Sequence, residues 1–350
     1  MLKTGMNMFR NTLKEDLYTF GSHFEKYSSV ASIPLKVNKV KKPFFTILIP
    51  TYKRTEIIEE TIQSALFQQT FGKEYEIVIV DNNPETKFDA ERSIYQDGRI
   101  SYFVNQKNIG LCGNWNRGIE LSKGKYIVML HDDDILGPYC LKNLYLAIRD
   151  NHYPGMVGCG IVNFSEIKEL SFTVPEKLSY RRITKRGFFF GRYIGICGMT
   201  FQKKLARKIG GFNESYYPNE DTNFIYQMLL VSSIIKIENS LAGYRKGVNL
   251  SLQGNTMREI IRKMELTRKN IAEHEIFARL WMHFFDKEYL YSYIISANRT
   301  WNMQMDYQEV FAECGFENSR ISKIKYNIMC ILLKIENRMS IKYEIQRRIS

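Results

Sequence analysis

The feature that most constrains the fold is an alternation of short apolar runs with helix-like segments between residues 44 and 150. The apolar runs cover residues 44–49, 76–80, 100–104 and 126–130, and β-branched or aromatic residues are frequent in them. Strands that are apolar on both faces are typical of the middle of a parallel sheet. The repeated order of strand and helix therefore predicts a Rossmann-like, doubly wound α/β sheet.

The chain beyond residue 153 is organised differently. Apolar runs at residues 156–164, 195–201 and 234–237 are separated by polar segments, and we interpret them as the second half of the same, mixed sheet. After about residue 255 we expect helices, over residues 258–278 and 287–301. The chain is therefore divided into a basic N-terminal extension, an α/β domain and an appended C-terminal helical region, at residues 1–42, 43–255 and 256–350.

Net charge and cysteine content indicate which classes of binding partner and which cellular compartment to expect. The 50 Lys and Arg against 37 Asp and Glu give a formal charge of +13, which favours nucleic acid, phospholipid headgroups or phosphate-bearing substrates. The six cysteines form no CxxC pair, which favours a reducing compartment. Residues 1–20 lack the apolar core of a signal peptide, and no apolar run approaches the roughly 18 residues that span a bilayer. We expect a cytoplasmic protein.

Ligands of open α/β sheets bind beyond the carboxyl ends of the strands, so the residues that follow each apolar run are informative. The first run is followed by Pro50, Thr51, Tyr52, Lys53 and Arg54, without a glycine. This segment matches neither the GxGxxG turn of dinucleotide-binding proteins nor the phosphate-binding loop of P-loop enzymes. A dehydrogenase or a P-loop enzyme is therefore not expected.

Carboxylates follow the second and the fourth apolar runs. Asp81 follows the second run, and His131, Asp132, Asp133 and Asp134 follow the fourth. A single Asp after a strand is commonly a turn former or a helix cap. Three consecutive carboxylates repel one another at neutral pH, so they need water, a donor or a cation. The cluster is either an exposed acidic turn or a site for a divalent ion such as Mg²⁺ that also binds a substrate's phosphates.

A second carboxylate pair, Glu220 and Asp221, precedes a predicted apolar helix over residues 222–231. Carboxylates in this position stabilise a helix through its dipole, which is the simplest explanation of the pair. The alternative is catalysis, because a carboxylate can remove the proton of an alcohol and convert it into a nucleophile.

Taken in order, these segments resemble the family 2 glycosyltransferases, which have the GT-A fold, use nucleotide sugars and in bacteria often build surface glycans. The resemblance covers residues 44 to about 250, and each motif is weak alone but specific in this order. It rests on the segment after the first strand, on an acidic cluster similar to the DXD motif, and on Asp81, Asn108, Gly110, Asn116, Gly118, Glu220 and Asp221.

The resemblance implies a role for each matching residue. Binding of Mg²⁺ or Mn²⁺ on the donor diphosphate is implied for Asp133 and Asp134, with Asp133 as the direct ligand. Asp221 is implied as the catalytic base, with Glu220 beside it to orient the acceptor or a nearby cation. Nucleotide binding is implied for Pro50, Thr51, Tyr52, Arg54, Asp81, Asn108, Gly110, Asn116 and Asp132.

Two positions depart from the family pattern. His131 stands where relatives often have another Asp, and we interpret it as a hydrogen-bond partner rather than a metal ligand. Gly247 stands where many relatives have a His that approaches the metal or the diphosphate. Either Arg245 or Lys246 then provides charge for the departing diphosphate, or the metal is held less tightly.

The resulting prediction is an inverting glycosyltransferase (EC 2.4) that moves a sugar from a nucleotide diphosphate donor, most simply a UDP-sugar, to a hydroxyl of a lipid-linked or oligosaccharide acceptor. Two other classes stay open. A sugar nucleotidyltransferase would usually have a glycine- and arginine-rich turn after the first strand, and residues 50–54 lack the glycines. A non-catalytic scaffold or nucleic-acid-binding protein would use the positive charge, but the sequence contains no recognised nucleic-acid motif, and we expect no such partner.

The last segment, residues 320–350, is predicted to form a basic amphipathic helix, with eight Lys and Arg against two Asp and Glu. Such a helix could lie on the anionic inner leaflet of the plasma membrane, where each cation contributes roughly 1 kcal/mol, and this would suit a polyprenyl-linked acceptor. The same pattern suits packing on the protein itself or on a second copy in a homodimer. The apolar positions recur at spacings of three and four, at Ile321, Ile324, Ile328, Ile331 and Ile335.

Overall fold

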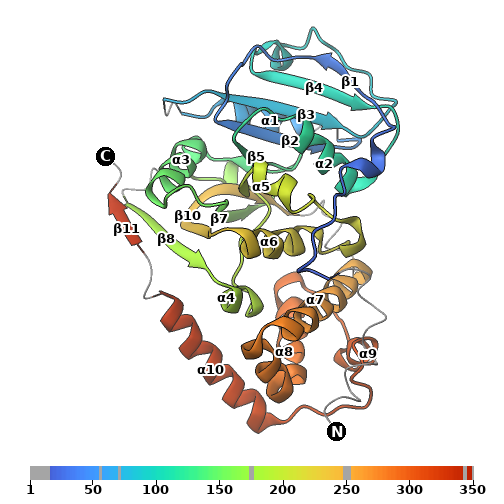
Figure 1. Cartoon of the computed structure of the whole chain (residues 1–350), viewed down its shortest axis with the longest axis vertical. Helices are drawn as coiled ribbons and strands as arrows, with labels where there is room; N and C mark the ends of the chain where they lie inside the picture. Colours follow the sequence, from blue (N-terminus) through green and yellow to red (C-terminus); the bar gives the residue numbers. More distant parts are fainter. Residues whose placement is uncertain are drawn as a thin grey trace.

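The computed structural model describes residues 16–54, 57–69, 72–172, 177–246, 254–341 and 345–348. A single mixed sheet has helices on both faces, and further helices form one end of the molecule (Figure 1). The strands are β1 (Ser32–Lys36), β2 (Phe45–Thr51), β3 (Tyr75–Asp81), β4 (Ile100–Asn105), β5 (Tyr126–Met129), β6 (Ile135–Leu136), β7 (Met156–Phe164), β8 (Lys177–Ile183), β9 (Thr200–Gln202), β10 (Ile234–Arg245) and β11 (Ile345–Arg348).

The helices alternate with these strands in the first half of the chain and follow them in the second. Short 3₁₀ turns are η1 (Glu25–Tyr27), η2 (Ser93–Gln96), η3 (Ile167–Glu169) and η4 (Glu214–Tyr216). The α-helices are α1 (Ile58–Leu66), α2 (Gly110–Leu121), α3 (Cys140–Asp150), α4 (Lys185–Phe189), α5 (Lys203–Lys208), α6 (Glu220–Val231), α7 (Gly254–His274), α8 (Ile276–Trp301), α9 (Tyr307–Glu313) and α10 (Lys323–Ile341).

The strand order in the sheet is β1-β4-β3-β2-β5-β9-β7-β10-β8-β11, and β6 pairs with β10. Strands β4, β3, β2 and β5 are parallel neighbours, as the alternation along the first half of the sequence predicts. Strand β9 runs antiparallel to both β5 and β7, and β7 runs parallel to β10. The predicted mixed α/β sheet with a C-terminal helical region is confirmed.

The side chains of β2 alternate between two hydrophobic cores. Phe45, Ile47 and Ile49 face the core that α1 and α3 complete, whereas Leu48 faces the core that α2 and α6 complete. All four side chains are fully buried. Coverage on both faces explains why the sequence of this strand is apolar throughout.

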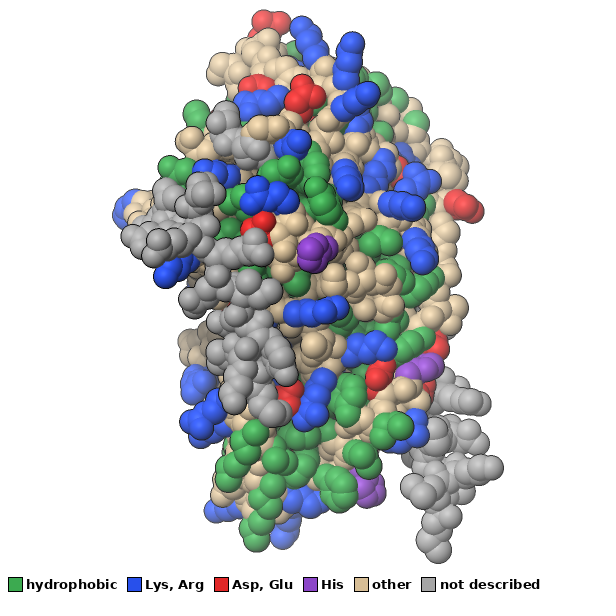
Figure 2. Space-filling model, turned by 60° about the vertical axis from the view of Figure 1, so that its left-hand side comes forward, with side chains coloured by type: hydrophobic (Ala, Val, Ile, Leu, Met, Phe, Trp, Pro, Cys, Tyr) green, Lys and Arg blue, Asp and Glu red, His purple; other side chains and the backbone are tan. Residues whose placement is uncertain are grey.

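The C-terminal helices have a smaller core of their own, formed mainly by α7, α8 and α9. No helix within the described residues is both long and apolar enough to cross a bilayer. Lys and Arg side chains are spread over the face of the molecule that Figure 2 shows, as the net charge of +13 leads one to expect.

Three helical predictions differ from the structure. The predicted helix over residues 258–278 is divided, because Glu275 has an extended backbone between α7 and α8. Between β3 and β4 only the short turn η2 forms. The predicted single helix over residues 320–350 ends at Ile341, and β11 pairs antiparallel with β8, while residues 342–344 and 349–350 lie outside the described part. Without β11, β8 would be an edge strand, and the backbone N–H and C=O groups of an edge strand can pair with a further strand.

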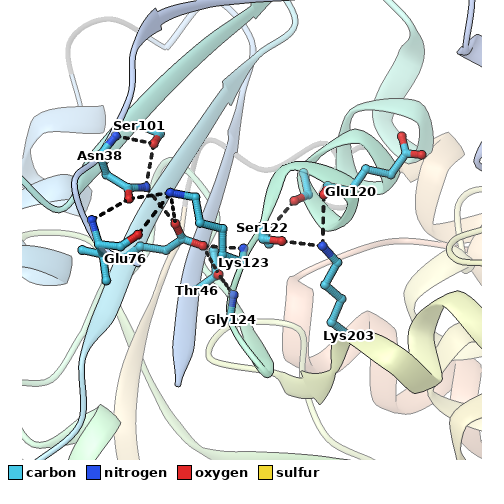
Figure 3. A network of polar contacts seen from close by, with 11 residues as sticks. Asn38, Thr46, Glu76, Ser101, Glu120, Ser122, Lys123, Gly124 and Lys203 are labelled. Carbon is cyan, nitrogen blue, oxygen red and sulfur yellow. Dashed lines mark hydrogen bonds and ion pairs between the residues drawn. The ribbon is translucent and has the colours of Figure 1, made fainter. Parts of the chain in front are cut away.

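Part of the N-terminal extension belongs to the sheet, since β1 pairs antiparallel with β4. The segment is held by the fully buried Glu76, which accepts hydrogen bonds from Asn38 Nδ2 and Thr46 Oγ1, both at 2.7 Å, and from the Lys123 N–H at 2.5 Å (Figure 3). The extension and the far C-terminal segment thus each contribute a strand to the sheet. The boundaries at residues 42 and 255 stay predictions.

Replacing Glu76 with Ala should destabilise the fold by about 3 kcal/mol, because three donors, two of them buried, would lose their common acceptor. The measurement is the midpoint of urea unfolding. Glu74→Ala is the matched control, since Glu74 lies two residues away and is exposed, and its effect should stay within about 0.5 kcal/mol. Equal midpoints for the two variants would show that Glu76 does not hold the extension.

Candidate active site

A cleft of about 580 Å³ opens at the carboxyl ends of β2, β3 and β5. Its size lies in the range usual for small-molecule sites. It is lined by Pro50, Thr51, Tyr52, Arg54, Asn82, Asn108, Gly110, Leu111, Asn114, Trp115, His131, Asp132, Asp133, Ile196, Tyr217, Pro218, Glu220, Asp221, Tyr244, Thr256 and Ile260. The structure thus brings together most of the residues that the sequence singled out.

The segment after β2 connects to the acidic residues after β5. Thr51 Oγ1 donates a hydrogen bond to Asp132 Oδ2 at 2.7 Å, and Arg54 Nη2 lies 3.8 Å from Asp133 Oδ2. Tyr52 is exposed beside them in the cleft wall. The two segments meet because β2 and β5 are parallel neighbours whose carboxyl ends lie at the same edge.

Asp81 lies in a smaller neighbouring pocket of about 70 Å³, which shares Thr51 and Arg54 with the cleft. Asp81 Oδ2 accepts hydrogen bonds from Thr86 Oγ1 at 2.6 Å and from the Tyr102 hydroxyl at 2.8 Å. Three aromatic side chains also line this pocket: Phe88, Tyr95 and Tyr102. Asp81 is therefore a fixed acceptor at the base of a partly aromatic pocket.

Asn82 organises the start of α2. Its Nδ2 donates to Asn108 Oδ1 at 2.8 Å and to the Gly110 carbonyl at 3.2 Å. Gly110 has φ +74°, a left-handed conformation that glycine adopts without strain. Asn108 and Gly110 reach the cleft, whereas Asn116 does not line it. Both ends of the Asn116 amide bond to the Phe212 backbone at 2.8 Å, which argues against the predicted contact of Asn116 with a nucleotide.

We define residues 131–134 as the acidic turn. Its first three residues line the cleft, and its last residue, Asp134, lies in the protein interior. Burial raises the pKa of Asp132 to about 6, and the hydrogen bond from Thr51 opposes this shift. Asp133 lines the cleft. Asp134 is fully buried behind it and accepts a hydrogen bond from the Arg245 N–H at 3.1 Å, and burial raises its pKa to about 8. Asp134 thus supports the turn from inside.

Glu220 and Asp221 begin α6 and both line the cleft. Burial, followed by the charge of Asp221, raises the pKa of Glu220 to about 8. Burial also raises the pKa of Asp221, although Thr222 donates to its Oδ1 from the backbone N–H at 2.6 Å. A carboxyl pair with raised pKa values in a cleft suits proton transfer near neutral pH.

Three buried polar atoms in the cleft wall have no hydrogen-bond partner within the described part of the chain: Trp115 Nε1, His131 Nε2 and Glu220 Oε2. The Trp115 ring also stacks on His131, with centroids 5.5 Å apart, and packs edge-on against Phe212. Burial lowers the pKa of His131, which favours the neutral imidazole. Such atoms also occur elsewhere in the described structure, but these three belong to residues that line a cleft, where a polar ligand can pair with them.

The two residues predicted to contact the diphosphate, Arg245 and Lys246, do not line the cleft. Arg245 is buried and does not line the cleft; its Nε donates to the Asp133 carbonyl at 2.9 Å, and its Nη2 pairs with Glu60. Arg245 therefore holds the acidic turn in place. Lys246 is exposed, and Gly247, the departure from the family pattern, lies outside the described residues.

Several lining residues were missed from the sequence. Thr256 and Ile260 come from α7, which the sequence assigns to a separate helical region. Tyr217 and Tyr244 approach from segments far along the chain. Nothing in the local pattern distinguishes these residues from ordinary packing residues, because only the tertiary fold brings them to the cleft.

Comparison with known proteins points to one family. Residues 46–210 match the family model described as glycosyl transferase family 2. The chain is 29% identical over 242 residues to the GalNAc(5)-diNAcBac-PP-undecaprenol beta-1,3-glucosyltransferase of Campylobacter jejuni, which covers 67% of this chain and 75% of that relative.

Solved structures show the same fold. TarS from S. aureus (residues 1–349) superposes with a TM-score of 0.53 at 16% identity, over 77% of this chain and 78% of TarS. TarS in complex with UDP-GlcNAc superposes with a TM-score of 0.52 at 18% identity, over 73% and 72% of the two chains. These likenesses confirm the predicted GT-A fold.

The matched family and the curated relative select one of the classes that the sequence left open, and the protein is an enzyme of the glycosyltransferase type (EC 2.4). The domain match begins within β2 and extends past the acidic turn to the end of α5. Residues 46–210 thus match glycosyltransferase family 2, and the chain has a curated glycosyltransferase relative and solved neighbours of the same fold.

Proposed function

We propose that the enzyme transfers one sugar from a UDP-sugar to a hydroxyl of a lipid-linked oligosaccharide, with inversion at the anomeric carbon. The observation that carries the proposal is that the acidic turn and the Glu220–Asp221 pair open onto the same cleft. One cleft can then hold both the leaving diphosphate and the attacking hydroxyl. The name of the Campylobacter relative describes an undecaprenol-linked oligosaccharide, which motivates the class of acceptor.

The pocket around Asp81 supports a uracil nucleotide. Asp81 accepts two side-chain hydrogen bonds on Oδ2 and one on Oδ1 from the Asn83 N–H, and a carboxylate has about four acceptor positions. One position therefore stays free for the N3–H of uracil, between the rings that line the pocket. TarS, a protein of the same fold, has been solved with UDP-GlcNAc.

The residues of the acidic turn fit a divalent cation. Potential ligand atoms of His131, Asp133 and Asp134 all lie within 4.8 Å of one another. His131 Nε2 and Asp134 Oδ2 have no hydrogen-bond partner in the described structure. Carboxylate oxygens suit both Mg²⁺ and Mn²⁺. When bound, such an ion would stabilise the negative charge that develops on the diphosphate.

We assign the remaining steps to side chains of the cleft. Asp221 accepts the proton of the acceptor hydroxyl, whose oxygen then bonds to the anomeric carbon from the face opposite the diphosphate. The bond between the anomeric carbon and the phosphate oxygen breaks, and its electron pair stays on the departing UDP. Arg54, which lines the same cleft, adds positive charge near Asp133. One displacement of this kind inverts the configuration.

The donor is tested by hydrolysis assays over a panel of UDP-, GDP- and CDP-sugars, with Mn²⁺, with Mg²⁺ and with EDTA. We expect hydrolysis of a UDP-sugar that requires the metal. Metal-independent hydrolysis, or a preference for a purine nucleotide, would reject the assignments of the acidic turn and of the Asp81 pocket.

The rate should depend on pH through the carboxyl pair. Asp221 must be ionised to accept a proton, and the pKa of its partner Glu220 is raised to about 8. Because burial raises the pKa of Asp221, we expect kcat/KM to fall as the pH is lowered, and at a higher pH than an exposed Asp would give. In Glu220→Gln the neighbouring charge is gone, so the fall should move to lower pH. Exposed Glu169→Gln is the control, and an unmoved profile in Glu220→Gln would contradict the coupling.

A further inference from the structure

Helix α10 packs on the protein through one face. Met329 is fully buried, and Tyr326 contacts Tyr291 of α8 with ring centroids 5.8 Å apart. Glu336 forms ion pairs with Arg186 at 2.8 Å and with Arg192 at 2.9 Å, next to α4. The helix is therefore attached along its length, and its attached face is not the predicted isoleucine face.

The opposite face of α10 carries an exposed apolar stripe. Its side chains are Ile324, Ile328, Ile331 and Ile335, with exposed fractions of 74%, 46%, 57% and 48%. A second stripe lies on α8, at Ile276, Leu280 and Phe284. Nine of the eighteen exposed large hydrophobic residues in the described structure belong to these two helices. Apolar exposure is thus concentrated here rather than scattered singly, which marks an interaction surface.

The exposed charged side chains on the described parts of α8 and α10 have one sign. The exposed ionisable side chains on the described part of α10 are Lys323, Lys325, Lys334 and Arg338. Its acidic residue, Glu336, is held in the ion pairs with Arg186 and Arg192. On α8 neither Asp286 nor Glu288 is exposed. Figure 2 shows the hydrophobic side chains gathered with Lys and Arg at the lower end of the molecule.

The neighbouring helices α7 and α9, in contrast, carry exposed carboxylates. Exposed carboxylates occur at Glu273, at the end of α7, and at Glu309 and Glu313 of α9. The lack of exposed acidic side chains is thus a property of the described parts of α8 and α10, and not of the whole helical region.

We propose that α10, with α8 beside it, docks on the surface of an anionic lipid bilayer, with the isoleucine stripe in the boundary between headgroups and acyl chains. An apolar stripe flanked by cations is the pattern of helices that lie in this boundary. A two-fold contact with a second copy would place the same cations opposite one another, so charge favours the bilayer. The role of this docking, which is to bring the cleft to a lipid-linked acceptor, rests on the proposed function, whereas the docking itself does not.

The docking face is connected to the cleft. Helix α7 packs along α8, and Thr256 and Ile260 of α7 line the cleft. One unit of helices thus provides both the membrane surface and a wall of the active site. A bilayer bound to α10 would fix the orientation of the cleft relative to the membrane.

The test is co-sedimentation of the full chain with vesicles of phosphatidylcholine alone or mixed with phosphatidylglycerol. We expect binding that requires the anionic lipid and weakens with salt. The double variant Ile328→Ser and Ile331→Ser should bind at least about tenfold more weakly, because two exposed apolar side chains that the bilayer would bury are lost. Ile167→Ser, an exposed isoleucine outside these helices, should bind as the wild type does. Equal binding of the double variant would overturn the proposal.

Sedimentation velocity without vesicles separates the bilayer from a second copy. A dimer that the double variant abolishes, with no vesicle binding by the wild type, would overturn the proposal in favour of a homodimer. Hydrolysis of the UDP-sugar in solution should be the same in all three proteins, because none of the changed residues lines the cleft. Vesicle binding without any hydrolysis would count against the proposed function and not against the docking face.

Discussion

Replacing Asp221 with Asn should lower kcat by about 100- to 10,000-fold and leave the affinity for UDP nearly unchanged. Asn has nearly the shape of Asp but cannot accept the proton of the acceptor hydroxyl. Asp221 lies at the start of α6 and lines the cleft, and burial raises its pKa, so the substitution removes a base without opening a cavity. Single-turnover transfer rates and calorimetric titration with UDP separate the two effects.

A helix-start carboxylate elsewhere provides the matched control. Asp306 is the N-cap residue of α9, and its side chain accepts a hydrogen bond from the Gln308 N–H at 2.7 Å. Asn also caps helices well, so Asp306→Asn should change neither stability nor rate appreciably. If Asp221 were only a helix cap, its variant would behave like this control. Equal losses of rate and of UDP affinity in Asp221→Asn would reject its role as the base.

Replacing Asp133 with Ala should lower kcat/KM on the order of 100-fold or more and remove the effect of Mn²⁺ on UDP binding. A divalent ion stabilises the departing diphosphate by several kcal/mol, and each 1.4 kcal/mol corresponds to a tenfold change in rate. Asp133 is the carboxylate of the acidic turn that both lines the cleft and lies near Arg54. Calorimetric titration with UDP, in Mn²⁺ and in EDTA, measures the loss.

The control for this prediction is the exposed Asp89→Ala, which changes a carboxylate of the smaller pocket but not of the acidic turn. It should keep the difference between Mn²⁺ and EDTA. If the UDP affinity of Asp133→Ala still rose on addition of Mn²⁺, the ion would have to be held by other groups, and the assignment of Asp133 would be wrong.

The sheet and the edge at which the site lies could be predicted because their signals are local. The strands that contain Ile47 and Ile79 are apolar on both faces, and such a continuous apolar run can be recognised from a few consecutive residues. Parallel strands end at a common edge, so Thr51 and Asp132 could be expected near one another.

The misplaced residues depend on contacts between distant segments. Asn116 bonds to Phe212, which is 96 residues away, and Arg245 bonds to the acidic turn, which is 112 residues away. Either side chain would suit a ligand if only its type and position were considered. The same reasoning explains Thr256 and Ile260, since their place in the cleft wall depends on how α7 packs against the sheet.

The C-terminal segment combines a feature that the sequence predicted with features that only the tertiary structure determines. The isoleucine spacing predicted an apolar stripe, but the sequence left open which surface would cover it. The structure shows that α10 attaches through Met329 and Glu336 instead, so the stripe around Ile328 is turned away from the protein. The switch to β11 was not predictable from helix propensity, because the edge of β8 determines it.

The account depends most directly on where a divalent ion binds when the donor nucleotide is present. The decisive measurement is a crystal structure of the full chain with UDP and Mn²⁺, with anomalous diffraction to locate the manganese. We expect one manganese in contact with an Asp133 carboxylate oxygen and with the diphosphate, in the cleft that Asp221 also lines. UDP bound in this cleft with no manganese at Asp133, and that carboxylate paired only with Arg54, would contradict the account.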